Sequence, residues 1–299
     1  MFNKLIVALM PLAPRFIVKM VSKRYIAGVD AESAIQKCLE LKSKGFLTTI
    51  DILGEAISEQ SQADEARESY LNLISLVASS GIEKNISLKP TALGLGLSEN
   101  AAFRNISEIV KKAEEAGVFI RIDMEDSPYT TQTIHIHDQL KLTHSNLGTV
   151  IQAYLHRSEA DVKAIAKAGG NLRICKGIYK ESPSIAFQGK QEVRDNFMHL
   201  VQIMLQEGAF VGIATHDTYL IEAAHELVTS MNISKDKYEF QALLGVSIME
   251  ELNSLIEEGH RVRIYVPYGK DWYAYSSRRL KENPDIAGYV LKNLFKLKK

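Results

Sequence analysis

Short β-rich runs alternate with longer helical stretches along almost the whole chain, and this alternation constrains the fold more than any other feature. Each run holds β-branched or aromatic residues, and a polar or glycine-containing loop then leads into a helical stretch. The predicted strands cover residues 46–53, 86–89, 119–124, 149–154, 171–176, 210–216, 238–243 and 262–267. Strands that alternate with helices form parallel sheets. Eight such units within about 250 residues favour a closed (βα)8, TIM-like barrel over an open sheet.

Glycine precedes most of the predicted strands, where it is typical of a helix C-cap. These glycines are Gly45, Gly81, Gly117, Gly148, Gly170, Gly208 and Gly259. No low-complexity linker or shift in composition divides the chain. We therefore expect one barrel domain over residues 46–299, a helical extension over residues 1–45 before it, and a last amphipathic helix over 284–299.

Composition limits the partners and the location that we expect. Lysine plus arginine equals aspartate plus glutamate, at 36 each, so the charge balance gives no reason to expect nucleic acid as a partner. Cys38 and Cys175 are too few for a cysteine metal framework and fit a reducing compartment. The apolar run over residues 5–12 is shorter than the roughly 18 residues that a membrane-spanning helix needs. We expect a basic amphipathic helix there, either packed on the body or lying on a membrane surface. We expect a cytoplasmic protein, which would be peripheral on the inner face of the membrane if this helix lies on the membrane surface.

Polar side chains mark the carboxyl ends of the predicted strands, which is where barrels build their active sites. Any one of them is more often half of a structural ion pair, but burying so many ionisable groups at one rim is unfavourable unless they pair or hold a ligand. These residues are Asp51, Glu55, Lys89, Asp123, Glu125, Gln152, Tyr154, Arg173, Lys176, Thr215, His216, Asp217, Glu239, Gln241 and Tyr265.

Three chemistries could use this rim. A catalytic metal is the weakest, because His135 and His137 lie beyond the end of the third strand and only His216 lies at a strand end. Schiff-base chemistry would need Lys89 or Lys176 with a lowered pKa. A third possibility is a large anionic cofactor at the cations of the fifth and sixth strands, with a small carboxylate substrate bound beyond the eighth. The sequence Gly94-Leu95-Gly96 lacks the rest of a dinucleotide fingerprint and is interpreted as a loop.

The segment Tyr275–Glu282 follows the eighth predicted strand. If it is helical, Tyr275, Arg278, Arg279 and Glu282 share one face, at positions i, i+3, i+4 and i+7. Alone, such an octapeptide is more often a solvated basic face. At the rim of a barrel, adjacent guanidinium groups favour bidentate binding of a substrate carboxylate.

Several ordered motifs resemble the proline dehydrogenase family, from Tyr25 to about Pro284. They are Asp51–Glu55, Leu88–Lys89, Ile122–Glu125, Gln152–Tyr154, Arg173–Tyr179, Ala214–His216, Tyr238–Leu243, Arg263–Pro267 and Tyr275–Glu282. The resemblance implies a flavin-dependent (βα)8 barrel that oxidises L-proline to Δ1-pyrroline-5-carboxylate by hydride transfer to FAD. It also implies a membrane quinone as electron acceptor and a separate pyrroline-5-carboxylate dehydrogenase downstream.

On the substrate side, the resemblance implies that Arg278 and Arg279 clamp the proline carboxylate and that Glu282 orients them. The residues implied to line the rest of the pocket are Tyr265, Tyr275, Leu243, Tyr179 as a gate, and Glu55 near the substrate amine. Lys89 and Asp123 match a buried pair lying against both ligands.

On the cofactor side, the resemblance implies that Arg173 lies near the reactive flavin nitrogen, with Gln152 also on the flavin ring. Lys176, Thr215 and His216 would bind the ribityl chain and the diphosphate. Two departures, Lys180 and Asp217, stand where bifunctional relatives have an aromatic residue and an asparagine, and they affect the expected adenine contacts.

The length leaves no room for a fused aldehyde dehydrogenase domain, so we expect a monofunctional form. The bulk of Tyr265 favours proline over hydroxyproline as substrate. Two other hypotheses are a Schiff-base lyase that uses Lys89 or Lys176, and a barrel that binds a ligand without turnover.

Overall fold

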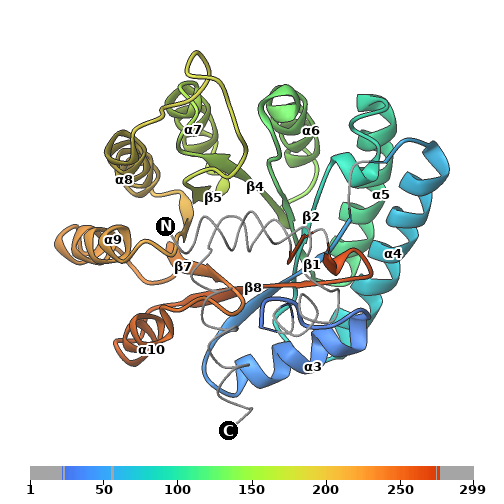
Figure 1. The fold of residues 1–299 in the computed structure, drawn as a ribbon, viewed down its shortest axis with the longest axis horizontal. Coiled ribbons are helices and arrows are strands. Elements are labelled where there is room, and N and C mark those ends of the chain that lie inside the picture. Colours follow the sequence, from blue (N-terminus) through green and yellow to red (C-terminus); the bar gives the residue numbers. More distant parts are fainter. Residues whose placement is uncertain (1–21, 23, 55–56, 274, 277–299) are drawn as a thin grey trace, which may run out of the picture.

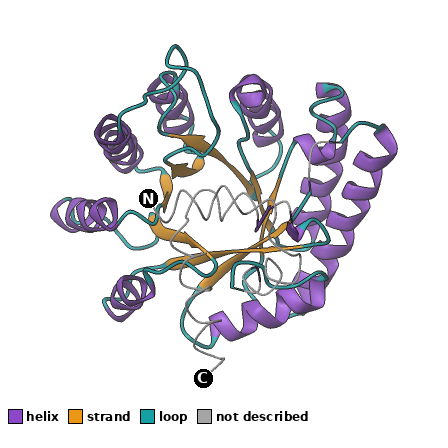
Figure 2. Ribbon diagram, in the orientation of Figure 1, coloured by secondary structure: helices purple, strands orange, loops and turns teal. Residues whose placement is uncertain are grey.

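Parallel strands close into a barrel in the same order as they occur in the chain, from β1 to β8 (Figures 1 and 2). The computed structural model describes residues 22, 24–54, 57–273 and 275–276. The closed order of the strands confirms the predicted (βα)8 barrel. The strands are β1 Leu47–Ile52, β2 Asn85–Leu88, β3 Phe119–Ile122, β4 Leu147–Gln152, β5 Asn171–Cys175, β6 Phe210–Ala214, β7 Tyr238–Leu243 and β8 Val262–Tyr268.

Helices surround the barrel and cover its outer face (Figure 2). They are α3 Ala31–Lys42, α4 Gln60–Ser79, α5 Glu99–Glu115, α6 Thr130–Lys141, α7 Ser158–Lys167, α8 Lys190–Gln206, α9 Thr218–Ser230 and α10 Met249–Glu257, with the short 3-10 helices η2 Thr91–Leu93 and η3 Ser127–Tyr129. Buried apolar residues of the strands and helices form one continuous core between the two layers. Among the described residues, no helix combines the length and the apolar character needed to cross a bilayer.

The barrel closes where β1 pairs with β8, through a continuous register from Leu47 with Arg263 to Ile52 with Tyr268. Helix α3 packs against both of these strands. It buries Ala34, Cys38 and Leu41 on the face that it presents to the barrel. Part of the expected N-terminal extension therefore covers the closure of the barrel, and the domain boundary at residue 45 stays a prediction.

Three predicted strands extend too far. The third ends at Ile122, the fourth at Gln152 and the sixth at Ala214, each two residues before the predicted end. The polar residues that follow, such as Asp123, Tyr154 and Thr215, therefore belong to the loops after these strands.

Two of the glycine predictions are wrong. Gly148 lies inside β4, where a Cβ atom would come within 2.3 Å of the Asn171 carbonyl oxygen and 2.8 Å of Arg121 Nη1. Close packing of strands, and not a helix cap, is what requires this glycine. At the end of α7 it is Gly169, with φ 65°, and not Gly170 that adopts the left-handed conformation.

The interior of the barrel is polar. Successive residues of a strand point to opposite faces, so the apolar residues of each strand pack outward under the helices while their neighbours point inward. Hydrogen bonds between strands that are not adjacent demonstrate this arrangement: Arg173 on β5 donates to Ser87 on β2, and Tyr265 on β8 donates to Asp123 beyond β3. Only the centre of the barrel allows such contacts.

Candidate active site

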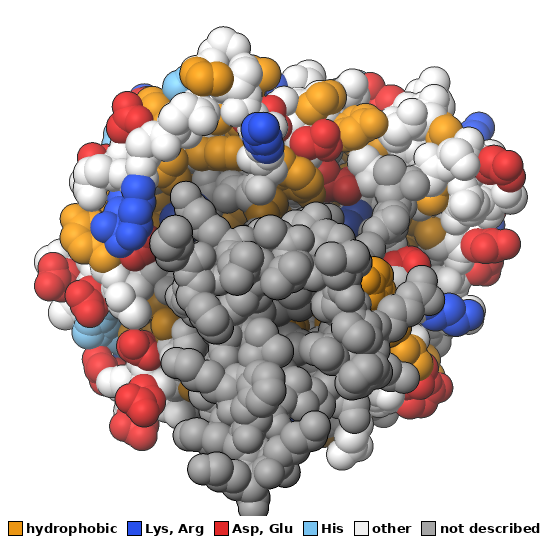
Figure 3. Space-filling view, viewed as in Figure 1, with side chains coloured by type: hydrophobic (Ala, Val, Ile, Leu, Met, Phe, Trp, Pro, Cys, Tyr) orange, Lys and Arg blue, Asp and Glu red, His pale blue; other side chains and the backbone are white. Residues whose placement is uncertain are grey.

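Side chains from five different strands or strand ends meet at the carboxyl end of the barrel interior. Asp51 lies in β1, Arg173 in β5 and Tyr265 in β8, whereas Lys89 and Asp123 are the first residues after β2 and β3. In the space-filling view, acidic and basic side chains lie near one another beside the residues drawn in grey (Figure 3). The fold thus places five of the expected polar groups in the region where barrels carry out their chemistry.

Lys89 forms an ion pair with Asp51. Its Nζ atom lies 2.6 Å from Oδ1 and 2.5 Å from Oδ2, and the aspartate side chain is fully buried. Burial lowers the pKa of Lys89, but the charges of Asp51 and Asp123 outweigh it and leave the pKa raised. The direct partner of Lys89 is thus Asp51, on the neighbouring strand β1, and the expected place of Lys89 and Asp123 against the flavin and the substrate stays a prediction.

Asp123 is held at both carboxylate oxygens. Arg173 Nη1 donates to Oδ1 at 2.8 Å, and the Tyr265 hydroxyl donates to Oδ2 at 2.9 Å. Burial, followed by the charge of Asp123, raises the pKa of Tyr265 well above its usual value. The tyrosine therefore remains a protonated donor at neutral pH.

Arg173 uses each of its donor groups on a different strand. In addition to the bond with Asp123, Nε donates to Gln241 Oε1 at 2.6 Å and Nη2 donates to Ser87 Oγ at 3.2 Å. The guanidinium also lies 5.2 Å from the centre of the Tyr265 ring. A cation with this many partners is fixed in position and orientation before any ligand binds.

A column of hydrogen bonds supports Arg173 from the amino end of the barrel. Gln241 Nε2 donates to Glu239 Oε1 at 2.6 Å, and Arg263 Nε donates to the same oxygen at 2.6 Å. Gly212 on β6 leaves room for this glutamine, because a Cβ atom there would come within 2.4 Å of Gln241 Nε2. Glu239 and Gln241, which were expected at the rim, thus lie beneath the site, with Glu239 near the amino end of β7.

A second, basic group lies around Asp217, directly before α9. Lys176 Nζ lies 3.2 Å from Asp217 Oδ2, and Arg194 on α8 donates to both carboxylate oxygens, at 3.0 and 2.6 Å. The hydrogen bond from Arg194 is the main cause that lowers the pKa of Asp217 to about 2. Two cations share one carboxylate here, so one positive charge is left for an anionic ligand.

The remaining expected cofactor residues have backbone partners. Gln152 donates to the Glu125 carbonyl oxygen at 2.7 Å and accepts from the Ile178 N–H at 3.2 Å, so it joins the loops after β3 and β5. His216 Nε2 accepts from the Leu243 N–H at 3.0 Å. Thr215 Oγ1 accepts from the Asp217 N–H at 3.1 Å. These bonds fix the loops of the rim.

The other expected pocket residues lie at three separate places. Leu243 is the last residue of β7 and is half-buried, and Tyr275 is buried. Tyr179 is half-buried in the loop after β5. Glu55, Arg278, Arg279 and Glu282 lie outside the described residues, so their expected roles stay predictions.

A family model for proline dehydrogenase matches residues 34–291 of this chain. The chain belongs to the proline dehydrogenase family. Proline dehydrogenase 1 of Bacillus subtilis strain 168 is 38% identical over 275 residues, which cover 92% of this chain and 91% of that protein. Proline dehydrogenase of Deinococcus radiodurans is 36% identical over 280 residues, with coverage of 92% and 90%.

Solved structures show the same barrel in longer proteins. The crystal structure of proline utilization A (PutA) from Bdellovibrio bacteriovorus inactivated by N-propargylglycine has a TM-score of 0.82 at 24% identity, over 89% of this chain and 33% of that one. PutA from Corynebacterium freiburgense has a TM-score of 0.75 at 23% identity, over 97% and 34%. This proline dehydrogenase family chain therefore spans about a third of the length of those PutA chains.

Family membership confirms the resemblance inferred from the motifs, and the ion pair of Lys89 argues against one alternative. A lysine that forms a Schiff base needs a lowered pKa, whereas the pKa of Lys89 is raised. Lys89 is therefore a poor Schiff-base lysine, and the match to the proline dehydrogenase family leaves the lyase hypothesis, with Lys89 or Lys176, not favoured. The sequence marked Asp51 as a polar strand end but did not show its ion pair with Lys89. It gave no indication of the ion pair between Arg194 and Asp217, because Arg194 lies within a helix and in no motif.

Proposed function

We propose that this chain oxidises L-proline to Δ1-pyrroline-5-carboxylate with FAD as the cofactor. The arrangement of Asp123 between Arg173 and Tyr265, in the barrel mouth of a proline dehydrogenase family member, is the observation that carries the proposal. When bound, FAD would supply the acceptor for a hydride from the ring carbon beside the proline nitrogen.

The described residues fit the charge of such a cofactor. A diphosphate is anionic, and the group of Lys176 and Arg194 around Asp217 carries one positive charge in excess. Arg173 adds a buried guanidinium at the centre of the barrel. We propose that Lys176, Thr215 and His216 face the diphosphate and ribityl groups and that Gln152 faces the flavin ring.

Arg173 performs the main electrostatic task in this proposal. Its position is fixed by Asp123, Gln241 and Ser87, so the guanidinium needs no reorganisation when negative charge develops nearby. Tyr265 holds Asp123 and walls the substrate pocket. Lys89 stays charged beside Asp51, which carries the compensating negative charge, so this pair adds a fixed hydrogen-bond donor and no net charge.

Substrate binding is proposed for residues at the end of the chain and around the mouth. Arg278 and Arg279 would hold the proline carboxylate, oriented by Glu282, while Glu55 would lie near the amine. Tyr275, Leu243 and Tyr179 would enclose the ring. A membrane quinone would take the electrons, a separate pyrroline-5-carboxylate dehydrogenase would consume the product, and the protein would act in the cytoplasm, at the inner face of the membrane when it transfers electrons.

The first experiment detects the product. Purified protein reconstituted with FAD, L-proline and a dye acceptor should form Δ1-pyrroline-5-carboxylate, and borohydride added during turnover should leave Lys89 and Lys176 unmodified. A lysine adduct would support the lyase instead. Bound flavin without product would support a barrel that only binds its ligand.

A second experiment tests the carboxylate clamp. Arg278→Ala should raise the proline KM by about a hundredfold, because removing one partner of a desolvated charge pair costs about 2–5 kcal/mol. Flavin content should stay near that of the unaltered protein. Unchanged proline kinetics would remove Arg278 from the clamp.

A further inference from the structure

A cluster of two histidines and a glutamate lies at the amino end of the barrel, opposite the candidate active site. His225 belongs to α9, Glu258 directly follows α10, and His260 lies two residues before β8. Helices run antiparallel to the strands in this fold, so the last turns of α9 and α10 lie near the start of β8. The proposed oxidation of proline uses none of these three residues.

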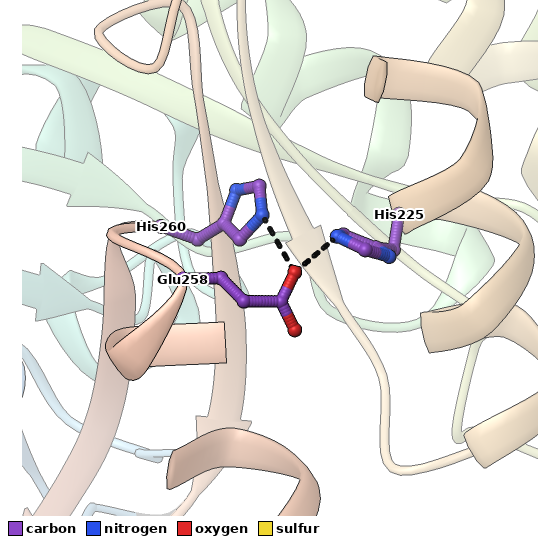
Figure 4. A group of neighbouring side chains, drawn as sticks. All are labelled: His225, Glu258 and His260. Carbon is purple, nitrogen blue, oxygen red and sulfur yellow. Dashed lines mark ion pairs between the residues drawn. The ribbon is translucent and has the colours of Figure 1, made fainter. Parts of the chain in front are cut away.

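The three side chains converge on one point. Figure 4 shows both imidazole rings turned toward the same carboxylate oxygen. His225 Nε2 lies 2.9 Å and His260 Nε2 lies 3.8 Å from Glu258 Oε2. One ligand atom from each residue lies within 4.8 Å of the other two.

His260 is already oriented for this point. Its Nδ1 atom lies 2.8 Å from the Tyr238 hydroxyl, and its ring packs edge-on against Phe240 with 5.7 Å between centres. The other ring nitrogen, Nε2, is therefore the one turned toward Glu258. A polar partner on the second ring nitrogen is the usual arrangement for a histidine that binds a metal.

The charge of a neighbouring lysine limits the affinity of this point for a cation. Lys235 lies beside the Glu258 carbonyl and its charge opposes a cation, so the affinity is expected to be below that of a closed four-ligand site.

We propose that His225, Glu258 and His260 bind one Zn²⁺ ion, with water as the remaining ligand. Two imidazoles and a carboxylate are typical zinc ligands, whereas Ca²⁺ and Mg²⁺ prefer oxygen atoms alone. Zinc–ligand bonds of about 2.0–2.1 Å in a tetrahedron place the ligand atoms about 3.3 Å apart. This value lies between the distances of 2.9 and 3.8 Å from His225 Nε2 and His260 Nε2 to Glu258 Oε2. His225 and Glu258 are 33% and 47% exposed, so both can adjust their positions.

Zinc at this site links α9 to the turn that begins β8. The ion binds the folded protein and cannot bind the unfolded chain in the same geometry, so it raises the thermal midpoint. Because the site lies at the far end of the barrel, it acts on stability and not on proline oxidation.

The test uses the full chain, loaded with FAD and freed of metal by a chelator. Equilibrium dialysis against ZnCl₂ should find one zinc per chain, and zinc should raise the thermal midpoint. His225→Gln and Glu258→Gln should each weaken zinc binding by at least about tenfold and remove the midpoint shift. Both residues are partly exposed, so these variants keep the fold intact.

A matched control is His144→Gln. His144 Nδ1 lies 2.6 Å from Glu114, and the pair belongs to none of the groups of three or more potential ligands found among the described residues. This variant should bind zinc as the unaltered protein does. The proposal is overturned if the unaltered chain binds no zinc, or if His225→Gln and Glu258→Gln bind it as tightly as His144→Gln.

Discussion

At the residue scale, Asp123 is the group that joins the cationic and aromatic halves of the candidate site. One oxygen accepts from Arg173 and the other from Tyr265. Hydrogen bonds to an ionised group contribute about 1.5–3 kcal/mol each, so the loss of either one loosens the other partner. Arg173 and Tyr265 should therefore act as a unit.

Tyr265→Phe should lower kcat/KM for proline by roughly thirtyfold, which corresponds to about 2 kcal/mol lost with the hydrogen bond to Asp123. Flavin content should not change, because the ring remains beneath Arg173. Steady-state kinetics with L-proline measure the effect. Tyr238→Phe is the control: it removes a hydroxyl that contacts His260 at the other end of the barrel and should leave kcat/KM unchanged. Equal kinetics for both variants would contradict the role of Tyr265.

Asp217 should make the stability depend on acid pH. Its pKa in the folded protein, about 2, lies below the ordinary 3.8, so folding favours the ionised form. The resulting stabilisation, about 2 kcal/mol, is present above pH 4 and is lost as the pH falls toward 2.

Urea unfolding at a series of pH values measures this contribution. Asp217→Asn should be less stable than the unaltered protein by about that amount at pH 7, with a difference that vanishes near pH 2. The control is Asp195→Asn, which changes an exposed residue beside Arg194. Its free energy of unfolding should stay within about 0.5 kcal/mol of that of the unaltered protein at every pH. A difference for Asp217→Asn that is the same at every pH would show that the ion pairs do not cause it.

At the element scale, strands β5, β6 and β7 form one device that positions Arg173. Gln241 on β7 reaches Arg173 on β5 across β6, and it can do so only because Gly212 presents no side chain between them. The smallest residue in β6 thus determines where the largest cation of the site lies.

Gly212→Ala should displace Gln241 and lower the rate of flavin reduction by proline by at least about tenfold, since a misplacement of about 1 Å can cost far more than that. Gly96→Ala is the control, because a Cβ atom there comes no closer than 3.3 Å to Tyr129 and Gly96 has no positive φ. Single-turnover flavin reduction by proline measures both variants. Normal rates in Gly212→Ala would mean that Gln241 does not position Arg173.

The local sequence pattern predicted most of the strands and helices, but it predicted few of the contacts between side chains. Strand β7 is predicted to the residue, because a polar turn over residues 234–237 precedes Tyr238–Leu243 and a turn with Gly245 follows it. Gly148 was misassigned because packing across the sheet, which no local pattern reports, decides its role. The partner of Lys89 likewise depends on which strands are neighbours, and Arg194 reaches the rim only through the placement of α8.

At the scale of the whole molecule, closure of the barrel assigns separate tasks to its two ends. The carboxyl end brings Asp51, Lys89, Asp123, Arg173 and Tyr265 together, and the motifs in the sequence anticipated this gathering because parallel strands all end at one rim. The amino end holds the Arg263–Glu239 pair and the histidine cluster. Arg263 and Glu239 lie within two of the motifs, but the motifs do not show that they pair, and the histidine cluster lies in no motif.

Anaerobic titration of the flavin-loaded protein with L-proline tests the central claim most directly. The account predicts that L-proline bleaches the long-wavelength flavin absorbance band completely, with one Δ1-pyrroline-5-carboxylate formed per flavin, and that D-proline at the same concentration leaves the band unchanged. A flavin band that persists at saturating L-proline would contradict the proposal that this barrel is a proline-oxidising enzyme.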